Sequence, residues 1–201
     1  MATIVLIHGG FYPEMDADRF WIQPGIAKAL AQCGHDVLAP NRLSVSPSWD
    51  AETAYLLETL PSSPVHVFGA SNGASVAARL AIEHPERIAS ITLAWPATAG
   101  VKEVDEYSKH ALAKSGVPDP SLLLSGGTLR GVLNAELALL KHKSAVIAAD
   151  PPDFAHRQIT VDQLLAKVPG MSGLGAFPVP FAPHFPSKLD EFVTAIDDFL
   201  K

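Results

Sequence analysis

The sequence is poor in cysteine, in basic charge and in long apolar runs. Cys33 is the single cysteine among 201 residues, which excludes an intrachain disulfide and a zinc site built from several cysteines. Lys and Arg number 15 against 21 Asp and Glu, so the net charge is −6, and no basic stripe is present. This charge balance argues against a nucleic-acid partner. No apolar run approaches the roughly 20 residues that a membrane span needs.

The remaining composition is that of an ordinary globular chain. Hydrophobic residues make up 48% and charged residues 18%, a balance that excludes disorder. The first ten residues have no basic lead-in and only a five-residue apolar run, unlike a secretion signal. We therefore expect one compact domain spanning residues 1–201, located in the cytoplasm and without a membrane partner.

Short apolar runs alternate along the chain with segments of helical period, which predicts β-α-β units. The expected fold class is α/β, with a doubly wound, mostly parallel sheet of about six strands and helices on both faces. The predicted strands are 3–7, 35–40, 65–68, 88–94, 144–149 and 173–181, and the predicted helices are 20–32, 49–60, 72–83, 160–167 and 187–200. Because Pro178 and Pro180 lie in the last strand, this strand must be at an edge or irregular.

The alternation is interrupted between residues 97 and 143. This segment contains two helical stretches, about 102–114 and 128–141, and no strand candidate. An insertion between two strands of a parallel sheet is usually a lid over its active face, and the alternative is a longer crossover that contacts no ligand. We therefore expect a small helical lid within the single domain.

The sequence Gly69-Ala70-Ser71-Asn72-Gly73 lies directly between a predicted strand and a predicted helix. At such a turn a central serine is held in a strained conformation that exposes its hydroxyl, and small neighbours let strand and helix approach closely. The amino end of the helix also favours a developing oxyanion. The pattern predicts a nucleophilic serine at the centre of the turn. The alternative is a glycine-rich turn whose serine only caps the helix.

A second glycine turn, His-Gly-Gly-Phe at residues 8–11, ends the first predicted strand. Ligands of a doubly wound sheet lie at the carboxyl ends of strands, where the strand order reverses. The first and third strands would be neighbours there, so this turn is expected to face Ser71. The backbone N–H of Gly10, or that of Phe11, would then form an oxyanion hole together with the N–H of Asn72.

The sequence contains eight histidines, of which His184 alone lies between the last predicted strand and the last predicted helix. A general base for Ser71 must come from another part of the chain, on a loop at the carboxyl edge of the sheet. His184 meets this requirement and is the predicted base. A solvent-exposed loop histidine is the alternative. The others lie in strands, on helices or, for His156, in a polar loop.

This order of parts resembles the α/β-hydrolase superfamily, and the resemblance covers residues 3–200. It implies an α/β-hydrolase fold that lacks the family's first two strands, and a triad in which an aspartate orients the histidine. The acid position depends on where the preceding strand ends. Asp153 is favoured, with Asp150 as the alternate. The sequence departs from the family at Asn72, where many members carry a large apolar residue or methionine.

The resemblance also implies a function, namely a serine hydrolase that cleaves a small ester, thioester or lactone through an acyl-enzyme on Ser71. The expected partner is therefore a small-molecule acyl substrate, and no metal or organic cofactor is expected. Five aromatic residues are candidates for an apolar substrate pocket, although core packing is the commoner fate of such residues: Phe11, Tyr12, Trp21, Trp49 and Trp95. No arginine or lysine lies near these motifs in the sequence, so a phosphorylated substrate is not indicated.

Three other functions remain as alternatives. The same fold also supports non-hydrolytic chemistry, such as a lyase step or carbon–carbon cleavage, or the binding of a small ligand without catalysis. Residues 69–75 also resemble the dinucleotide turn of short-chain dehydrogenases, which would make the protein an NAD(P) binder. Against that interpretation, Ser75 replaces the expected third glycine, the motif follows the third strand, and no tyrosine has a lysine four residues later.

Overall fold

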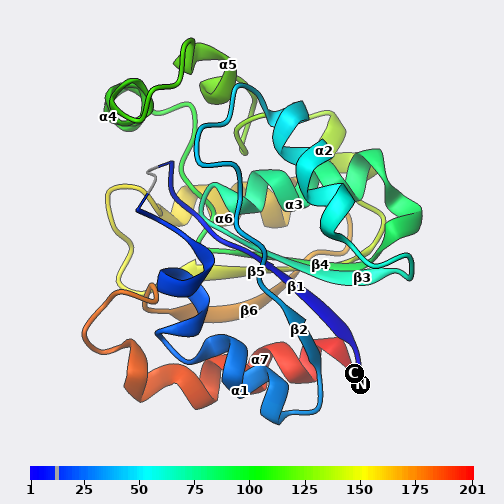
Figure 1. Ribbon diagram of the computed structural model, residues 1–201. Coiled ribbons are helices and arrows are strands. Elements are labelled where there is room, and N and C mark those ends of the chain that lie inside the picture. The colour runs from blue at the N-terminus through cyan, green and yellow to red at the C-terminus, as the bar shows by residue number, and fades with distance from the viewer. Residues whose placement is uncertain (12–13) are drawn as a thin grey trace.

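The computed structural model describes residues 1–11 and 14–201. Within these residues, six strands form one parallel sheet in the order β2-β1-β3-β4-β5-β6 (Figure 1). The strands are β1 (Thr3–Ile7), β2 (Asp36–Leu38), β3 (Val65–Ala70), β4 (Ile88–Ala94), β5 (Lys143–Ala149) and β6 (Ser172–Phe177). The predicted doubly wound sheet is confirmed. The order reverses between β1 and β3, where ligand crevices form in such sheets.

Helices cover both faces of the sheet (Figure 1). One face carries α1 (Ile26–Gln32) and α7 (Leu189–Leu200), and the other carries α2 (Trp49–Thr59), α3 (Gly73–Glu83) and α6 (Gln158–Lys167). The described residues also form four short helical turns: η1 (Asp18–Ile22), η2 (Pro85–Arg87), η3 (Glu136–Leu139) and η4 (Phe185–Lys188). The single helix predicted over 20–32 is divided into η1 and α1, because Gly25 has a left-handed backbone with φ of 85°.

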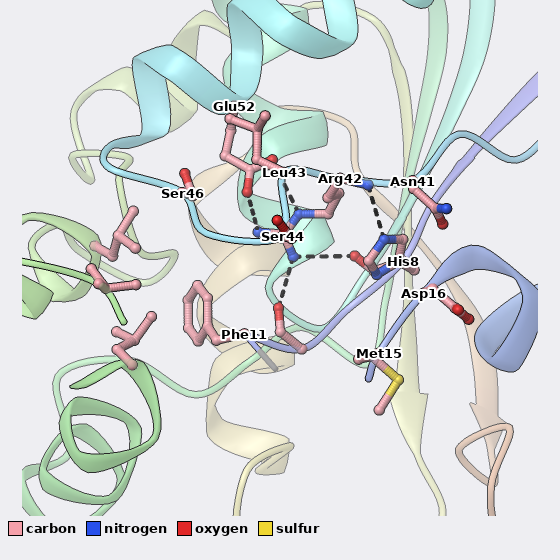
Figure 2. Close-up of a pocket in the computed structure, with 14 residues that line it drawn as sticks. His8, Phe11, Met15, Asp16, Asn41, Arg42, Leu43, Ser44, Ser46 and Glu52 are labelled. Carbon is pink, nitrogen blue, oxygen red and sulfur yellow. Dashed lines mark hydrogen bonds and ion pairs between the residues drawn. The ribbon is translucent and has the colours of Figure 1, made fainter. Parts of the chain in front are cut away.

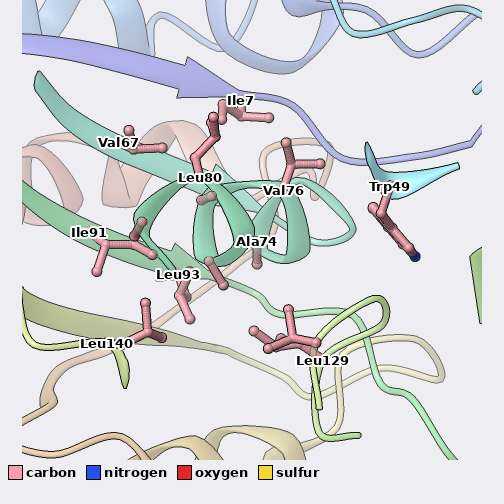
Figure 3. Packing of buried hydrophobic residues seen from close by; sticks show 14 of the residues in the cluster. Ile7, Trp49, Val67, Ala74, Val76, Leu80, Ile91, Leu93, Leu129 and Leu140 are labelled. Atoms are coloured by element: carbon pink, nitrogen blue, oxygen red, sulfur yellow. The ribbon is translucent and has the colours of Figure 1, made fainter. Parts of the chain in front are cut away.

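Alanines give α3 a close fit against the sheet. Ala74, Ala77 and Ala78 are fully buried, and Figure 3 shows this helix surrounded by apolar side chains from β1, β3 and β4. Small side chains on the buried face let the helix backbone approach the strands, and larger residues such as Leu80 fill the space beside it. This packing fixes the amino end of α3 directly beyond β3.

The last predicted strand is an edge strand, as its prolines require. β6 pairs only with β5 and ends at Phe177, so Pro178 and Pro180 follow the strand and need donate no ladder hydrogen bond. The chain then makes two tight turns before η4, with the N–H of Ala182 bonded to the carbonyl of Val179 at 2.9 Å. These turns fix the path of the loop and therefore the directions of the side chains of Val179 and Phe181.

The segment between β4 and β5 is only partly helical as predicted. It forms α4 (Lys102–Lys114) and α5 (Pro120–Leu124), which stand beyond the layer of α2, α3 and α6 (Figure 1). The predicted helix over 128–141 is wrong, because this stretch forms isolated antiparallel bridges and the short turn η3. Gly126 and Gly131 have φ of 130° and 71°, conformations that do not continue a helix.

Within residues 1–11 and 14–201, no helix combines the length and the apolar character required to cross a membrane.

Candidate active site

The turn between β3 and α3 has the strained geometry expected of a nucleophile elbow. Ser71 has a left-handed backbone with φ of 51°, and its N–H donates to the carbonyl of Ala94 on β4 at 2.9 Å. A Cβ at Gly9 would lie 2.6 Å from the Cβ of Ser71, so the end of β1 is packed directly against the elbow. The predicted contact between the two glycine turns is therefore present.

Gly73 is expected to tolerate no side chain. A Cβ at this position would lie 2.5 Å from the carbonyl oxygen of Ile7 and 2.6 Å from that of His8, and neither backbone atom can move cheaply. We expect Gly73→Ala to lower the free energy of unfolding by about 1–3 kcal/mol, as overpacking does in other cores. Urea denaturation measures this. Gly173→Ala is the matched control, because its Cβ would enter open space; an equal loss in both variants would contradict the prediction.

The imidazole that contacts Ser71 belongs to His156. Its Nε2 lies 3.0 Å from the Ser71 hydroxyl oxygen, and its Nδ1 lies 2.8 Å from Oδ2 of Asp153. An Nδ1–H donating to the carboxylate leaves Nε2 free to accept the serine proton. Serine, histidine and aspartate thus form a continuous hydrogen-bonded chain, the arrangement that activates a serine hydroxyl for nucleophilic attack.

His184 does not occupy the predicted position. The structure places it in an exposed turn before η4, where its carbonyl accepts the Ser187 hydroxyl at 2.8 Å. The physical reason is the path of the chain after β6, whose tight turns direct Val179 and Phe181 to the cavity beside Ser71. The predicted pairing of His184 with Ser71 is therefore corrected to His156.

The sequence interpretation passes over His156 because this residue lies in a polar loop and not after the last predicted strand. Its partner Asp153 is only three residues earlier. Both residues lie in the loop between β5 and α6, and Oδ1 of Asp153 accepts the backbone N–H groups of Ala155 at 2.7 Å and of His156 at 2.8 Å. This side-chain turn folds the loop so that one carboxylate holds both the backbone and the ring of His156. An Asp-x-x-His sequence after a central strand is the signal that could have found it.

The acidic partner is Asp153, whereas Asp150 lies apart from the imidazole. Asp150 is exposed, and its N–H donates to the carbonyl of Phe177 on β6 at 3.0 Å. Burial alone would raise the pKa of Asp153. The hydrogen bond and charge of His156 and the two backbone N–H donors lower this pKa, and together they outweigh the effect of burial. The resulting pKa lies below the ordinary value, so this carboxyl group stays charged at neutral pH.

A cavity of about 280 Å³ opens beside the Ser71 hydroxyl. Its walls come from the two glycine turns, the loop after β6 and helix α4, and they are mainly apolar, with Phe20, Trp95 and Phe181 among them. Gly10, Phe11 and Asn72, the predicted oxyanion-hole residues, also line it. The size suits a small-molecule ligand.

Of the other aromatic candidates, Trp21 and Trp49 belong to the core. Trp21 is fully buried and packs edge-on against Phe68, with ring centroids 5.4 Å apart, and it does not line the cavity. Trp49 lies against Phe11 on the other face of the sheet from Trp21, with ring centroids 6.0 Å apart. Tyr12 lies outside the described residues.

Comparison with known proteins assigns the family. Residues 2–115, more than half of the chain, match the family model described as the alpha/beta hydrolase fold. The chain belongs to the α/β-hydrolase family. No curated protein matches the sequence significantly.

Solved structures of two serine hydrolases and a thioesterase domain share the fold over the whole chain. A serine hydrolase involved in carbazole degradation (the CarC enzyme) has a TM-score of 0.75 at 15% identity, covering 100% of this chain and 91% of that chain. The serine hydrolase CCSP0084 from Cycloclasticus zankles, a polyaromatic hydrocarbon-degrading bacterium, has a TM-score of 0.72 at 21% identity, covering 100% and 90%. The thioesterase domain from the curacin biosynthetic pathway gives 0.69 at 15%, covering 100% and 91%.

In this α/β hydrolase a buried arginine lies beside the elbow, although no arginine or lysine lies near these motifs in the sequence. Arg130 lines the cavity and donates to Oδ1 of Asn72, to the carbonyl of Thr98 and to the Ser108 hydroxyl, each at 3.0 Å. It also pairs with Asp105 of α4 at 3.1 Å. Burial lowers the pKa of Arg130, and Asp105 partly opposes this. The arginine links α4 to the residue that follows the serine.

Across the described parts of the chain, no group of three or more His, Cys, Asp or Glu side chains is arranged to hold a metal ion.

His8, at the carboxyl end of β1, is buried and neutral. Its Nδ1–H donates to the carbonyl of Gly9 at 2.9 Å, and its Nε2 accepts the N–H of Arg42 at 3.0 Å. Burial and then the positive charge of Arg42 lower the pKa of His8 to about 4. Protonation would place a second cation beside the arginine and remove the Nε2 acceptor.

This low pKa predicts a loss of stability in mild acid. Between about pH 6.5 and pH 4 the unfolded chain binds a proton at His8 that the folded chain does not, so the free energy of unfolding falls as the pH falls. A pKa lowered by this much corresponds to about 3 kcal/mol at pH 4. Urea denaturation at pH 7, 5.5 and 4 measures the slope. We expect a flatter slope in His8→Asn, and an unchanged slope would contradict the prediction.

Proposed function

We propose that the protein is a serine hydrolase that forms an acyl-enzyme on Ser71. The observation that carries the proposal is the 3.0 Å contact between the Ser71 hydroxyl and Nε2 of His156, with Asp153 on the opposite ring nitrogen. His156 removes the serine proton as the hydroxyl attacks a substrate carbonyl, and the carboxylate of Asp153 stabilises the resulting imidazolium. The backbone N–H of Asn72 and an N–H of the 8–11 turn hold the oxyanion.

The reaction completes in two further steps. The imidazolium of His156 donates its proton to the leaving group, which departs with the bonding electrons as the carbonyl re-forms on Ser71. A water molecule then attacks the acyl-enzyme, with His156 again as the base, and the acid product and free serine are released. Every proton transfer uses Nε2 of His156, so the position of this nitrogen beside the Ser71 hydroxyl is essential to the mechanism.

The cavity supports a small, largely apolar acyl group as substrate. Its volume of about 280 Å³ and its aromatic walls suit a short ester, thioester or lactone. We propose that residues 97–143 act as the lid of a single domain, because Val104, Ser108 and Ala111 of α4 face this cavity and Arg130 ties α4 to Asn72. Arg130 also favours substrates with a polar group at that wall.

Ester hydrolysis tests this function. We expect wild-type protein to hydrolyse p-nitrophenyl esters from acetate to octanoate, with a preference for chains that fit the cavity. Ser71→Ala is expected to lower kcat by a factor on the order of 10⁴ or more, because no other nucleophile occupies the elbow. Ser75→Ala is the matched control, since this serine is buried in α3, directly after the elbow, and does not line the cavity. Equal turnover by Ser71→Ala and wild type would refute the proposal.

A further inference from the structure

We propose that Arg42 is a positioning residue that orients the 8–11 turn so that the N–H of Phe11 points toward Ser71. The proposal rests on the function proposed above and selects between the two candidate donors of that turn. Arg42 lies in the loop that connects β2 to α2 and is 7% exposed. It touches neither Ser71 nor the apolar cavity, so its effect must pass through the turn.

Arg42 makes three contacts with this single turn (Figure 2). Its Nη1 donates to the carbonyl of Gly10 at 2.9 Å and to that of His8 at 3.3 Å, and its backbone N–H donates to Nε2 of His8 at 3.0 Å. Charge-assisted hydrogen bonds of this kind are about twice as strong as neutral ones. Two carbonyls of a glycine-rich turn are therefore held on the side of Arg42.

Glu52 fixes the orientation of the guanidinium. Its carboxylate oxygens accept from Nη2 of Arg42 at 3.0 Å and from Nε at 3.3 Å, a two-point contact that leaves Nη1 directed at the turn. The Glu52 side chain is 1% exposed and that of Arg42 is 4% exposed. Because desolvating two charges largely cancels their attraction, such a pair adds little net stability. What it supplies here is a fixed direction for Nη1.

The orientation of the donor follows from peptide geometry. In a trans peptide the C=O of one residue and the N–H of the next point in opposite directions. The carbonyl of Gly10 and the N–H of Phe11 share one peptide, so binding the carbonyl to Arg42 turns the Phe11 N–H away from Arg42. Two cavities border this turn, one beside Arg42 and the other beside Ser71, and Gly10 and Phe11 line both. The N–H of Phe11 thus faces the cavity that contains the nucleophile.

Gly10 makes this orientation accessible. Its φ is 81°, a conformation that residues with a side chain rarely adopt, and a Cβ there would lie 2.6 Å from Cγ of Met15. Gly9 and Gly10, the two residues that precede Phe11, also leave the turn free to rotate when nothing holds its carbonyls. Arg42 removes that freedom before the substrate arrives, and preorganised donors stabilise a developing oxyanion most effectively.

The kinetic test compares Arg42→Met with Arg87→Met. Arg87 is a matched control, because its Nη2 also donates to two carbonyls, those of Leu60 at 3.2 Å and Pro61 at 2.8 Å, away from the site. For p-nitrophenyl acetate, we expect Arg42→Met to lower kcat on the order of 10²-fold with little change in KM, as loss of one oxyanion donor does. Arg87→Met should retain wild-type kcat. Arg42→Lys, which keeps a cation at the turn, should recover part of the loss.

Two further measurements keep the proposal open to refutation. Glu52→Gln retains the arginine but loosens its orientation, and we expect a smaller kcat loss in the same direction. Amide hydrogen exchange of residues 8–11, which requires no substrate, should be faster in Arg42→Met than in wild type and unchanged in Arg87→Met. Equal kcat in the two methionine variants, or unchanged exchange in Arg42→Met, would overturn the positioning role. If the proposed serine-hydrolase function itself were wrong, Ser71→Ala would instead hydrolyse p-nitrophenyl acetate as fast as wild type.

Discussion

Replacing His156 with alanine is expected to lower kcat/KM for ester hydrolysis by a factor on the order of 10⁴ or more. Its Nε2, 3.0 Å from the Ser71 hydroxyl, is the group placed to take the serine proton and to return it to the leaving group. Without it the serine must attack as a neutral alcohol. KM should change little, because His156 contributes only part of the cavity wall.

His184→Ala is the matched control for this variant. His184 also follows a strand of the sheet and lies in a loop, but it is exposed in the turn before η4. We expect its replacement to leave kcat/KM near the wild-type value. The opposite result, with His184→Ala inactive and His156→Ala active, would mean that His184 is the catalytic base, as its position in the sequence predicts.

Asp153→Asn is also expected to have a large effect, a fall in kcat on the order of 10⁴. Oδ1 of Asp153 already accepts two backbone N–H groups, so the carbonyl of an asparagine would remain there. The amide NH₂ would then face Nδ1 of His156 and force the ring proton onto Nε2. That tautomer cannot accept the proton of Ser71.

Steady-state kinetics of Asp153→Asn and Asp150→Asn measure this effect. Asp150 lies three residues earlier in the same loop, and the structure uses its backbone N–H rather than its carboxylate to contact β6. We expect Asp150→Asn to retain most of the wild-type kcat, and circular dichroism should show both variants folded. Similar losses in the two variants would indicate that the loop tolerates no change at all, and would remove the specific role of Asp153.

Local patterns were sufficient to predict the framework and the strained turn that contains Ser71. Strand-length apolar runs defined the sheet, and the family model and solved structures agree with that fold. The geometry of the Gly69–Gly73 turn is determined by its own residues. A Cβ at Gly69 would lie 2.4 Å from the carbonyl oxygen of Gly73, so only glycine at this position lets β3 and α3 approach so closely. Such constraints act within a few residues, and a sequence displays them directly.

The features that depend on tertiary geometry were not predictable in the same way. Two loops follow neighbouring strands β5 and β6, and each contains a histidine at the carboxyl edge of the sheet. The choice between them depends on the turn that Asp153 makes with two backbone amides.

Residues 128–141 were mistaken for a helix because their apolar spacing is helical, although Leu129, Val132, Leu137 and Leu140 are buried in bridges and turns. The pair of Arg42 with Glu52 gives no sequence signal beyond two charges ten residues apart.

The most direct measurement is the rate of covalent labelling by a fluorophosphonate, with the modified peptide located by mass spectrometry. We expect a single adduct on Ser71, rapid labelling of wild type and His184→Ala, and labelling of His156→Ala slowed by several orders of magnitude. An adduct on another residue, or unimpaired labelling of His156→Ala, would contradict the activation of Ser71 by His156.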